Sequence, residues 1–268
     1  MSEPYLKYAK DGRVVTITLS RPDERNAIGS HEDCQEFVDA IARVADDPEV
    51  AAVILTGEGS AFCAGGNLKN MRDRIGIGAL ETPMQTRNNY KRGIQRIPQA
   101  LWELEIPTIA AINGHAIGVG LDLACMCDIR IAADNAKLAA SFIKIGIVPG
   151  DGGAFFLPKA VGLSKAAEMI FTGDTMTAEQ ALACGLVSAA HSGDSLMEEA
   201  RRLASRIAAN PPQTLRLSKR LLREGQHARL SEVLDLSAAY QALAHETKDH
   251  TEALAAFFDK RSPEFSGH

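Results

Sequence analysis

The stretch from Ile109 to Ile131 holds the residues best suited to chemistry. A short apolar run ends at Asn113-Gly114, and a glycine-rich turn then leads to Gly118-Val119-Gly120 and to Asp122. We interpret this stretch as a strand, a turn and the start of a helix. The amides of the Gly-Val-Gly segment would open that helix without intrahelical acceptors, and the helix dipole favours a negative charge beside them. An anion-binding site within one helical turn of the Asp122 carboxyl is an arrangement suited to catalysis.

The same segment also matches G-x-G-x-x-A, the fingerprint of dinucleotide-binding folds. That motif needs a full strand–helix–strand unit and an acidic residue about 20 residues further on. Here a second apolar strand begins at Asp128, which leaves room for about two helical turns. NAD binding is therefore not expected, and a tight turn before a buried helix is the purely structural alternative.

Two other glycine-rich segments carry comparable signals. Gly65-Gly66 follows a buried strand, 50–56, and precedes a short helix, 68–72, so the chain makes a strand, a glycine turn and a helix start twice. Two such clusters of free amides could converge on one oxygen atom. Asp151 lies in the loop 145–153, whose glycines would bring it close to a substrate. The structural alternative for Asp151 is a cap of a turn or helix.

Composition excludes several classes of protein. The chain has 268 residues and a net charge of −5, which argues against nucleic acid and anionic membrane surfaces as main partners. No apolar run approaches a bilayer span, and the N-terminus has no signal-peptide pattern. The five cysteines, odd in number, indicate buried free thiols in a reducing cytoplasm. No C-x-x-C pair and no metal-ligand spacing among the histidines occurs, so no metal is expected.

The elements that position these residues fall into two regions. Residues 1–194 alternate strands and helices, beginning with a hairpin around Asp11-Gly12 and a helix, 31–45, capped by Ser30 and Asp33. Residues 75–83 are expected to be a mobile loop, and 84–104 a helix that Pro98 kinks or restarts. Residues 195–268 show no strand pattern, and their helices are expected at 195–210, 212–223, 230–244 and 247–258.

Short motifs run in order over essentially the whole chain. They occupy residues 21–27, 62–68, 112–120, 127–132, 146–153, 157–162, 172–174, 183–187 and 255–263. Together they resemble the crotonase superfamily, also called the enoyl-CoA hydratase/isomerase family. The resemblance implies an α/β fold, a spiral of ββα units followed by a C-terminal α-helical trimerisation region. It also implies an acyl-CoA thioester substrate, with its enolate held by two backbone amides that fall on Gly66 and Val119.

The acidic residues depart from the family's pattern. Hydratases of the family use two glutamates; the first position falls on Asp122, one methylene shorter, and the second on Phe142, which cannot transfer a proton. Asp151 is the natural substitute, so Asp122 and Asp151 are the predicted acid/base pair. Carboxyls paired in a dry pocket acquire separate pKa values. For Asp122 the alternative is a buried, paired structural carboxylate.

Other positions are assigned to the coenzyme A thioester through the resemblance. They are Arg25, Ala27, Ala64, Asn67, Leu68, Lys69, Gly118, Phe142, Phe258 and Lys260. Arg25 and Lys69 could meet phosphates, with solvated surface charge as the alternative. Phe258 and Lys260 resemble a pair that covers the adenine end, often across a subunit boundary. Pocket walls are expected from 71–90 and around Phe142. No cofactor is implied, because coenzyme A is part of the substrate.

Three functions follow, from two classes. Hydration of a 2-enoyl-CoA comes first, and double-bond isomerisation by one aspartate base is the alternative. A non-catalytic acyl-CoA- or RNA-binding relative is the alternative of another class. The net charge and the shortness of the basic cluster 219–223, interpreted as a solvated helix face, argue against RNA. Apolar residues at helical spacing in 195–268 predict an interface, and the resemblance implies a homo-oligomer, a trimer or hexamer, built through this region.

Overall fold

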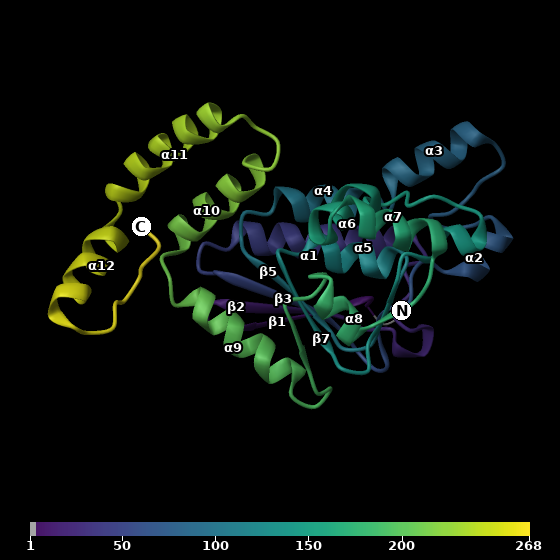
Figure 1. Ribbon diagram of the computed structural model, residues 1–268, viewed down its shortest axis with the longest axis horizontal. Coiled ribbons are helices and arrows are strands. Elements are labelled where there is room, and N and C mark those ends of the chain that lie inside the picture. The colour runs from purple at the N-terminus through teal and green to yellow at the C-terminus, as the bar shows by residue number, and fades with distance from the viewer. Residues whose placement is uncertain (1–3) are drawn as a thin grey trace.

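In the computed structural model, residues 4–268 are described and form two sheets flanked by helices (Figure 1). The six-stranded sheet has the order β1-β2-β3-β5-β7-β10, and the four-stranded sheet the order β4-β6-β8-β9. The large sheet comprises β1 (Leu6–Asp11), β2 (Val14–Leu19), β3 (Ala52–Gly57), β5 (Thr108–Ile112), β7 (Ile129–Ala133) and β10 (Ala189–His191). The small sheet comprises β4 (Ala61–Cys63), β6 (His115–Ile117), β8 (Lys137–Ala139) and β9 (Met176–Thr177).

Successive strands alternate between the two sheets, which produces a spiral. β3 and β4, then β5 and β6, then β7 and β8, each add one strand to the large sheet and one to the small sheet. The intervening helices are α2 (Leu68–Asp73), α3 (Pro83–Arg92), α4 (Arg96–Glu103) and α5 (Val119–Met126). Next come α6 (Gly153–Val161), α7 (Leu163–Thr172) and α8 (Ala178–Ala183), and the short 3-10 helices η1 (Pro22–Glu24) and η2 (Ser141–Ile145) complete the region. The predicted ββα spiral is confirmed.

Both faces of the large sheet are buried, because its central strands alternate between two cores. Val53 and Leu55 of β3 face a large apolar cluster that includes α1 (His31–Asp46), α4 and α5. Ala52 and Ile54 face the opposite way, onto Leu196, Ala200 and Ala204 of α9 (Leu196–Ala208). The predicted capping box at Ser30 and Asp33 of α1 is confirmed. Since α9 covers the sheet, the core extends past residue 195.

Three local features differ from the predictions. Residues 84–104 form two helices, so the predicted restart occurs, but the chain already turns at Gly93–Gln95. Pro98 lies in the first turn of α4, where its missing N–H has no intrahelical acceptor. α6 was not predicted, since Pro158 interrupts its helical pattern. The strands β4, β6 and β9 were also missed, because two or three residues are too few to show alternation.

The last helices project from the core (Figure 1). They are α10 (Pro212–Glu224), α11 (Leu230–His245) and α12 (Lys248–Asp259). α10 is fixed to the core by Lys219, which pairs with Asp128 at 2.6 Å and donates to the Ile106 carbonyl. The solvated face predicted for 219–223 is therefore wrong at Lys219, which is only 5% exposed. Across residues 4–268, no helix is both long and apolar enough to cross a membrane.

Candidate active site

The first amide site lies at the start of α5. Gly118 has φ +56° and ψ −122°, a backbone conformation that residues other than glycine rarely adopt. A Cβ on Gly120 would overlap the carbonyl oxygen of Cys63, so the helix start is packed directly on the end of β4. Val119 is the first helical residue, and its N–H consequently has no acceptor within the helix.

The second amide site lies at Gly66, directly after β4. The Ile28 N–H donates to the Gly65 carbonyl, and the Asn67 N–H donates to the Ile28 carbonyl. Backbone groups alternate in direction along an extended chain, so the N–H between these two bonds, that of Gly66, points away from Ile28. A Cβ on Gly65 would come within 2.9 Å of the Ile117 carbonyl oxygen, so this segment lies against the residues leading into α5.

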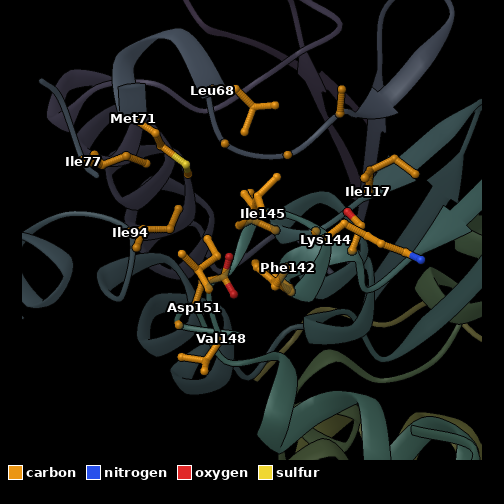
Figure 2. A pocket seen from close by; sticks show the side chains of 18 of the residues that line it. Leu68, Met71, Ile77, Ile94, Ile117, Phe142, Lys144, Ile145, Val148 and Asp151 are labelled. Carbon is orange, nitrogen blue, oxygen red and sulfur yellow. The ribbon is translucent and has the colours of Figure 1, made fainter. Parts of the chain in front are cut away.

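A cavity of about 150 Å³ is lined by both amide sites, Gly66 and Val119. Figure 2 shows side chains around this cavity, with Asp151 and Phe142 among them. Seven of the residues predicted from the sequence line it: Ala64, Gly66, Leu68, Gly118, Val119, Phe142 and Asp151. Its other walls are largely apolar and include Met71, Ile77, Tyr90, Ile94, Ile117 and Val148. The range 71–90 thus supplies walls, as expected, and Phe142 of η2 makes one side apolar. Ile94 and Ile117 carried no distinguishing signal in the sequence.

Asp122 and Asp151 form a buried pair at this cavity. Their exposed fractions are 1% and 4%, and only Asp151 lines the cavity, so Asp122 lies behind it. A Cβ on Gly153 would overlap both carboxylate oxygens of Asp122, which places that carboxyl against the start of α6. Glycine at position 153 is therefore what admits the carboxyl to this site.

The electrostatics of the pair favour one shared proton. Burial, and then the neighbouring Asp151 carboxyl, raise the pKa of Asp122 well above its ordinary value of 3.8. Burial also raises the pKa of Asp151, while a hydrogen bond from Asp122 acts in the opposite direction. Among the described residues, no hydrogen-bond partner is found for either Asp122 oxygen or for Asp151 Oδ1. A proton held on Asp122 and shared with Asp151 accounts for both observations.

The structural alternatives for the two aspartates have little support. Asp151 does not cap α6, because Gly152 occupies the N-cap position with φ +111° and no side chain caps the helix. Within residues 4–268 no Lys, Arg or His forms an ion pair with Asp122 or Asp151. The same part of the chain contains no group of three His, Cys, Asp or Glu side chains placed to hold a metal ion.

Other predicted contacts lie outside the cavity. Asn67 caps α2, since its Oδ1 accepts from the N–H groups of Lys69 and Asn70. Lys69 is exposed on α2, Arg25 is exposed after η1, and Ala27 is buried beside it. Phe258 and Lys260 lie at the end of α12, at the opposite end of the molecule from α2 (Figure 1). A single chain does not bring these last two residues to its own cavity.

Comparison with known proteins agrees with this architecture. The family model described as enoyl-CoA hydratase/isomerase matches residues 9–268. A probable enoyl-CoA hydratase of Mycobacterium bovis is 37% identical, over 96% of each chain. The 1,2-epoxyphenylacetyl-CoA isomerase of Escherichia coli is 33% identical over 100% of each chain. The crystal structure of an enoyl-CoA hydratase from Bacillus anthracis superposes with a TM-score of 0.92, at 33% identity, covering 98% of this chain and 100% of that one. The chain belongs to the enoyl-CoA hydratase/isomerase family.

Proposed function

We propose that the protein adds water across the double bond of a 2-enoyl-CoA thioester, with Asp122 and Asp151 as the acid/base pair. The observation that carries this proposal is the buried carboxyl pair at the cavity that the Gly66 and Val119 amides line. Three of its four oxygens have no hydrogen-bond partner among residues 4–268. Hydration needs a group that accepts a proton and a group that returns one. A pair of carboxyls sharing one proton contains both.

In this mechanism the oxygen of water bonds to the β carbon of the thioester. Asp151, which lines the cavity, accepts the proton that the water loses. The pair, which stores a proton on Asp122, then returns one proton to the α carbon, so the net change is one water added. Between these steps the thioester oxygen carries negative charge, and the N–H groups of Gly66 and Val119 stabilise it. One such donor contributes about 3–4 kcal/mol to lowering a barrier.

Isomerisation of a 3-enoyl-CoA is the second candidate. The observation in its favour is that only one of the two aspartates, Asp151, lines the cavity, while Phe142 makes part of its wall apolar. A single base could remove a proton from the α carbon and deliver it to the γ carbon, with the same amides holding the enolate. This reaction needs no positioned water.

One experiment distinguishes the two reactions. Crotonyl-CoA and a 3-enoyl-CoA are each incubated with the protein in D₂O, and the products are followed by NMR. A hydratase converts crotonyl-CoA to the 3-hydroxy thioester with deuterium at the α carbon. Shift of the double bond in the 3-enoyl-CoA, without any 3-hydroxy product, would instead establish the isomerase. Absence of turnover of both thioesters would contradict both proposals.

We also propose that the protein assembles as a trimer, or as a hexamer of two trimers, in the cytoplasm. Large apolar side chains remain exposed along α10–α12: Leu222, Leu230, Leu234, Leu243, Leu254, Phe257 and Phe258. Exposed apolar surface of this extent is typical of an interface. In such an assembly Phe258 and Lys260 would contact the coenzyme A bound by a neighbouring subunit. Arg25 and Lys69 would bind the phosphates of the coenzyme A bound by their own chain. All five cysteines are free thiols, consistent with a reducing compartment.

A further inference from the structure

The chain between α3 and α4 contacts the loop that carries Asp151. This 90–98 elbow runs from the last turn of α3, through the break at Gly93, into the first turn of α4. The loop, 150–152, consists of Asp151 with one glycine on each side. Glycine restrains backbone dihedrals less than any other residue, so this loop has little stiffness of its own. Contacts from neighbouring elements must therefore hold the Asp151 carboxyl in place.

Gln95 makes the polar contact between the elbow and the loop. Its side-chain Nε2 donates a hydrogen bond of 2.8 Å to the carbonyl oxygen of Gly150. That carbonyl belongs to the peptide unit joining Gly150 to Asp151, so the bond restrains the rotation of that peptide unit. Only the amide nitrogen of Gln95 can donate to a carbonyl, which fixes the orientation of the side chain.

Two apolar contacts flank this hydrogen bond. A Cβ on Gly150 would come within 2.9 Å of Tyr90 Cε1, and a Cβ on Gly152 within 3.4 Å of Pro98 Cβ. The Tyr90 ring therefore packs against the backbone on one side of Asp151, and Pro98 against the other. Burial raises the pKa of Tyr90, and the Asp151 carboxyl raises it further, in keeping with their closeness.

We propose that Gln95 is a positioning residue for Asp151, holding the 150–151 peptide so that the carboxyl faces the cavity between the Gly66 and Val119 amides. The inference rests on the proposed role of Asp151 as the base. Gln95 itself does not line the cavity, so it acts through the loop. A catalytic group displaced by about 1 Å can lose on the order of 100-fold in rate.

The first test replaces the donor while keeping the length of the side chain. Gln95→Met is expected to lower kcat roughly 10- to 100-fold on the thioester that the wild type turns over, with KM changed by less than about 3-fold. The matched control is Gln35→Met: Gln35 accepts a hydrogen bond from Arg96 of α4 and does not touch the loop. Its kcat should stay within about 2-fold of wild type. Equal rates for Gln95→Met and Gln35→Met would overturn the proposal.

A double-mutant cycle separates positioning from a general loss of structure. In an Asp151→Asn background there is no base to position, so adding Gln95→Met should change the residual rate by less than about 2-fold. If the two losses multiply instead, Gln95 acts independently of Asp151 and the proposal is wrong. Gln95→Glu, which keeps size and polarity but turns the donor into an acceptor, should lower kcat as Gln95→Met does and replaces it if that variant does not fold.

Hydrogen exchange tests the positioning without any activity. Peptides covering 146–153 should exchange faster in Gln95→Met than in wild type, and at the wild-type rate in Gln35→Met. Should the wild type turn over no thioester, the proposed function fails while this measurement still decides whether Gln95 restrains the loop. Unchanged exchange over 146–153 in both Gln95 variants would refute the restraint.

Discussion

Asp122 and Asp151 lie 29 residues apart in the chain, yet both carboxyls share one buried site beside the start of α6. Their residue type and their glycine neighbours could be recognised in the sequence. The contact of Gly153 with Asp122 could not, because it depends on how α5 packs against α6. The same holds for Gln95, an ordinary polar residue until the break before α4 brings it to Gly150.

Stability should depend on pH through Asp122. Its folded-state pKa is raised above the ordinary value of 3.8, so above about pH 4 the folded protein holds a proton that the unfolded chain has released. The free energy of unfolding therefore falls as pH rises through the interval between the two pKa values. Asp122→Asn, which stays neutral, should make this fall shallower, leaving the part that the raised pKa of Asp151 contributes, and should unfold at a higher temperature than wild type at pH 7. Thermal unfolding from pH 4 to pH 8 measures both effects.

The surface variant Asp23→Asn serves as its control and should retain the wild-type slope. A slope unchanged in Asp122→Asn would show that Asp122 is not the protonated member of the pair.

Gly153→Ala should damage catalysis more than folding. The added Cβ would overlap the Asp122 carboxyl, which must move and separate from Asp151. We expect a loss of roughly 100-fold in kcat. Gly193→Ala is the matched control, because nothing lies within 4 Å of its Cβ. A Gly153→Ala enzyme as fast as Gly193→Ala would mean that the position of Asp122 does not matter.

The elements were predictable where their patterns are long. β1, β2, α1 and the helices beyond residue 195 follow from alternation, capping and helical spacing. Elements of the small sheet were missed because β4, β6 and β9 have two or three residues each. The break between α3 and α4 was only partly foreseen, through Pro98, since the turn itself occurs earlier, at Gly93. The two amide sites could be predicted without these strands, because the glycine residues indicate a turn before each helix start.

The contacts of the buried Lys219 with Asp128 and Ile106 should stabilise the attachment of α10. Lys219→Ala removes the nearest cation of Asp128, which keeps Arg223, and leaves the Ile106 carbonyl without its donor. It should cost about 1–3 kcal/mol in the free energy of unfolding. Arg220→Ala, its neighbour, removes an exposed pair with Glu105 and should cost less than about 1 kcal/mol. Urea titration of both variants measures the difference. Equal midpoints would show that the contacts of Lys219 contribute no more than an exposed ion pair.

For the whole molecule, the proposed assembly depends on the apolar side chains that α11 and α12 leave exposed. Phe257 and Phe258 are 78% and 76% exposed at the far end of the molecule (Figure 1). Replacing both by serine should dissociate the proposed assembly in light scattering and weaken acyl-CoA binding. Phe171→Ser, equally exposed on α7 at 76%, should leave the mass unchanged. A double variant with wild-type mass and affinity would show that Phe257 and Phe258 contribute neither to assembly nor to acyl-CoA binding.

If Asp122 and Asp151 act as one catalytic pair, the rate should respond to them as a unit. The measurement is kcat on crotonyl-CoA for wild type, Asp122→Asn, Asp151→Asn and the double variant. Loss of an acid or base group costs on the order of 100- to 10,000-fold. Because the two carboxyls work as a unit, we expect each single variant to lose that much and the double variant to lose little more. Single variants that retain wild-type rates, or a double variant whose loss is the product of the two, would contradict the account.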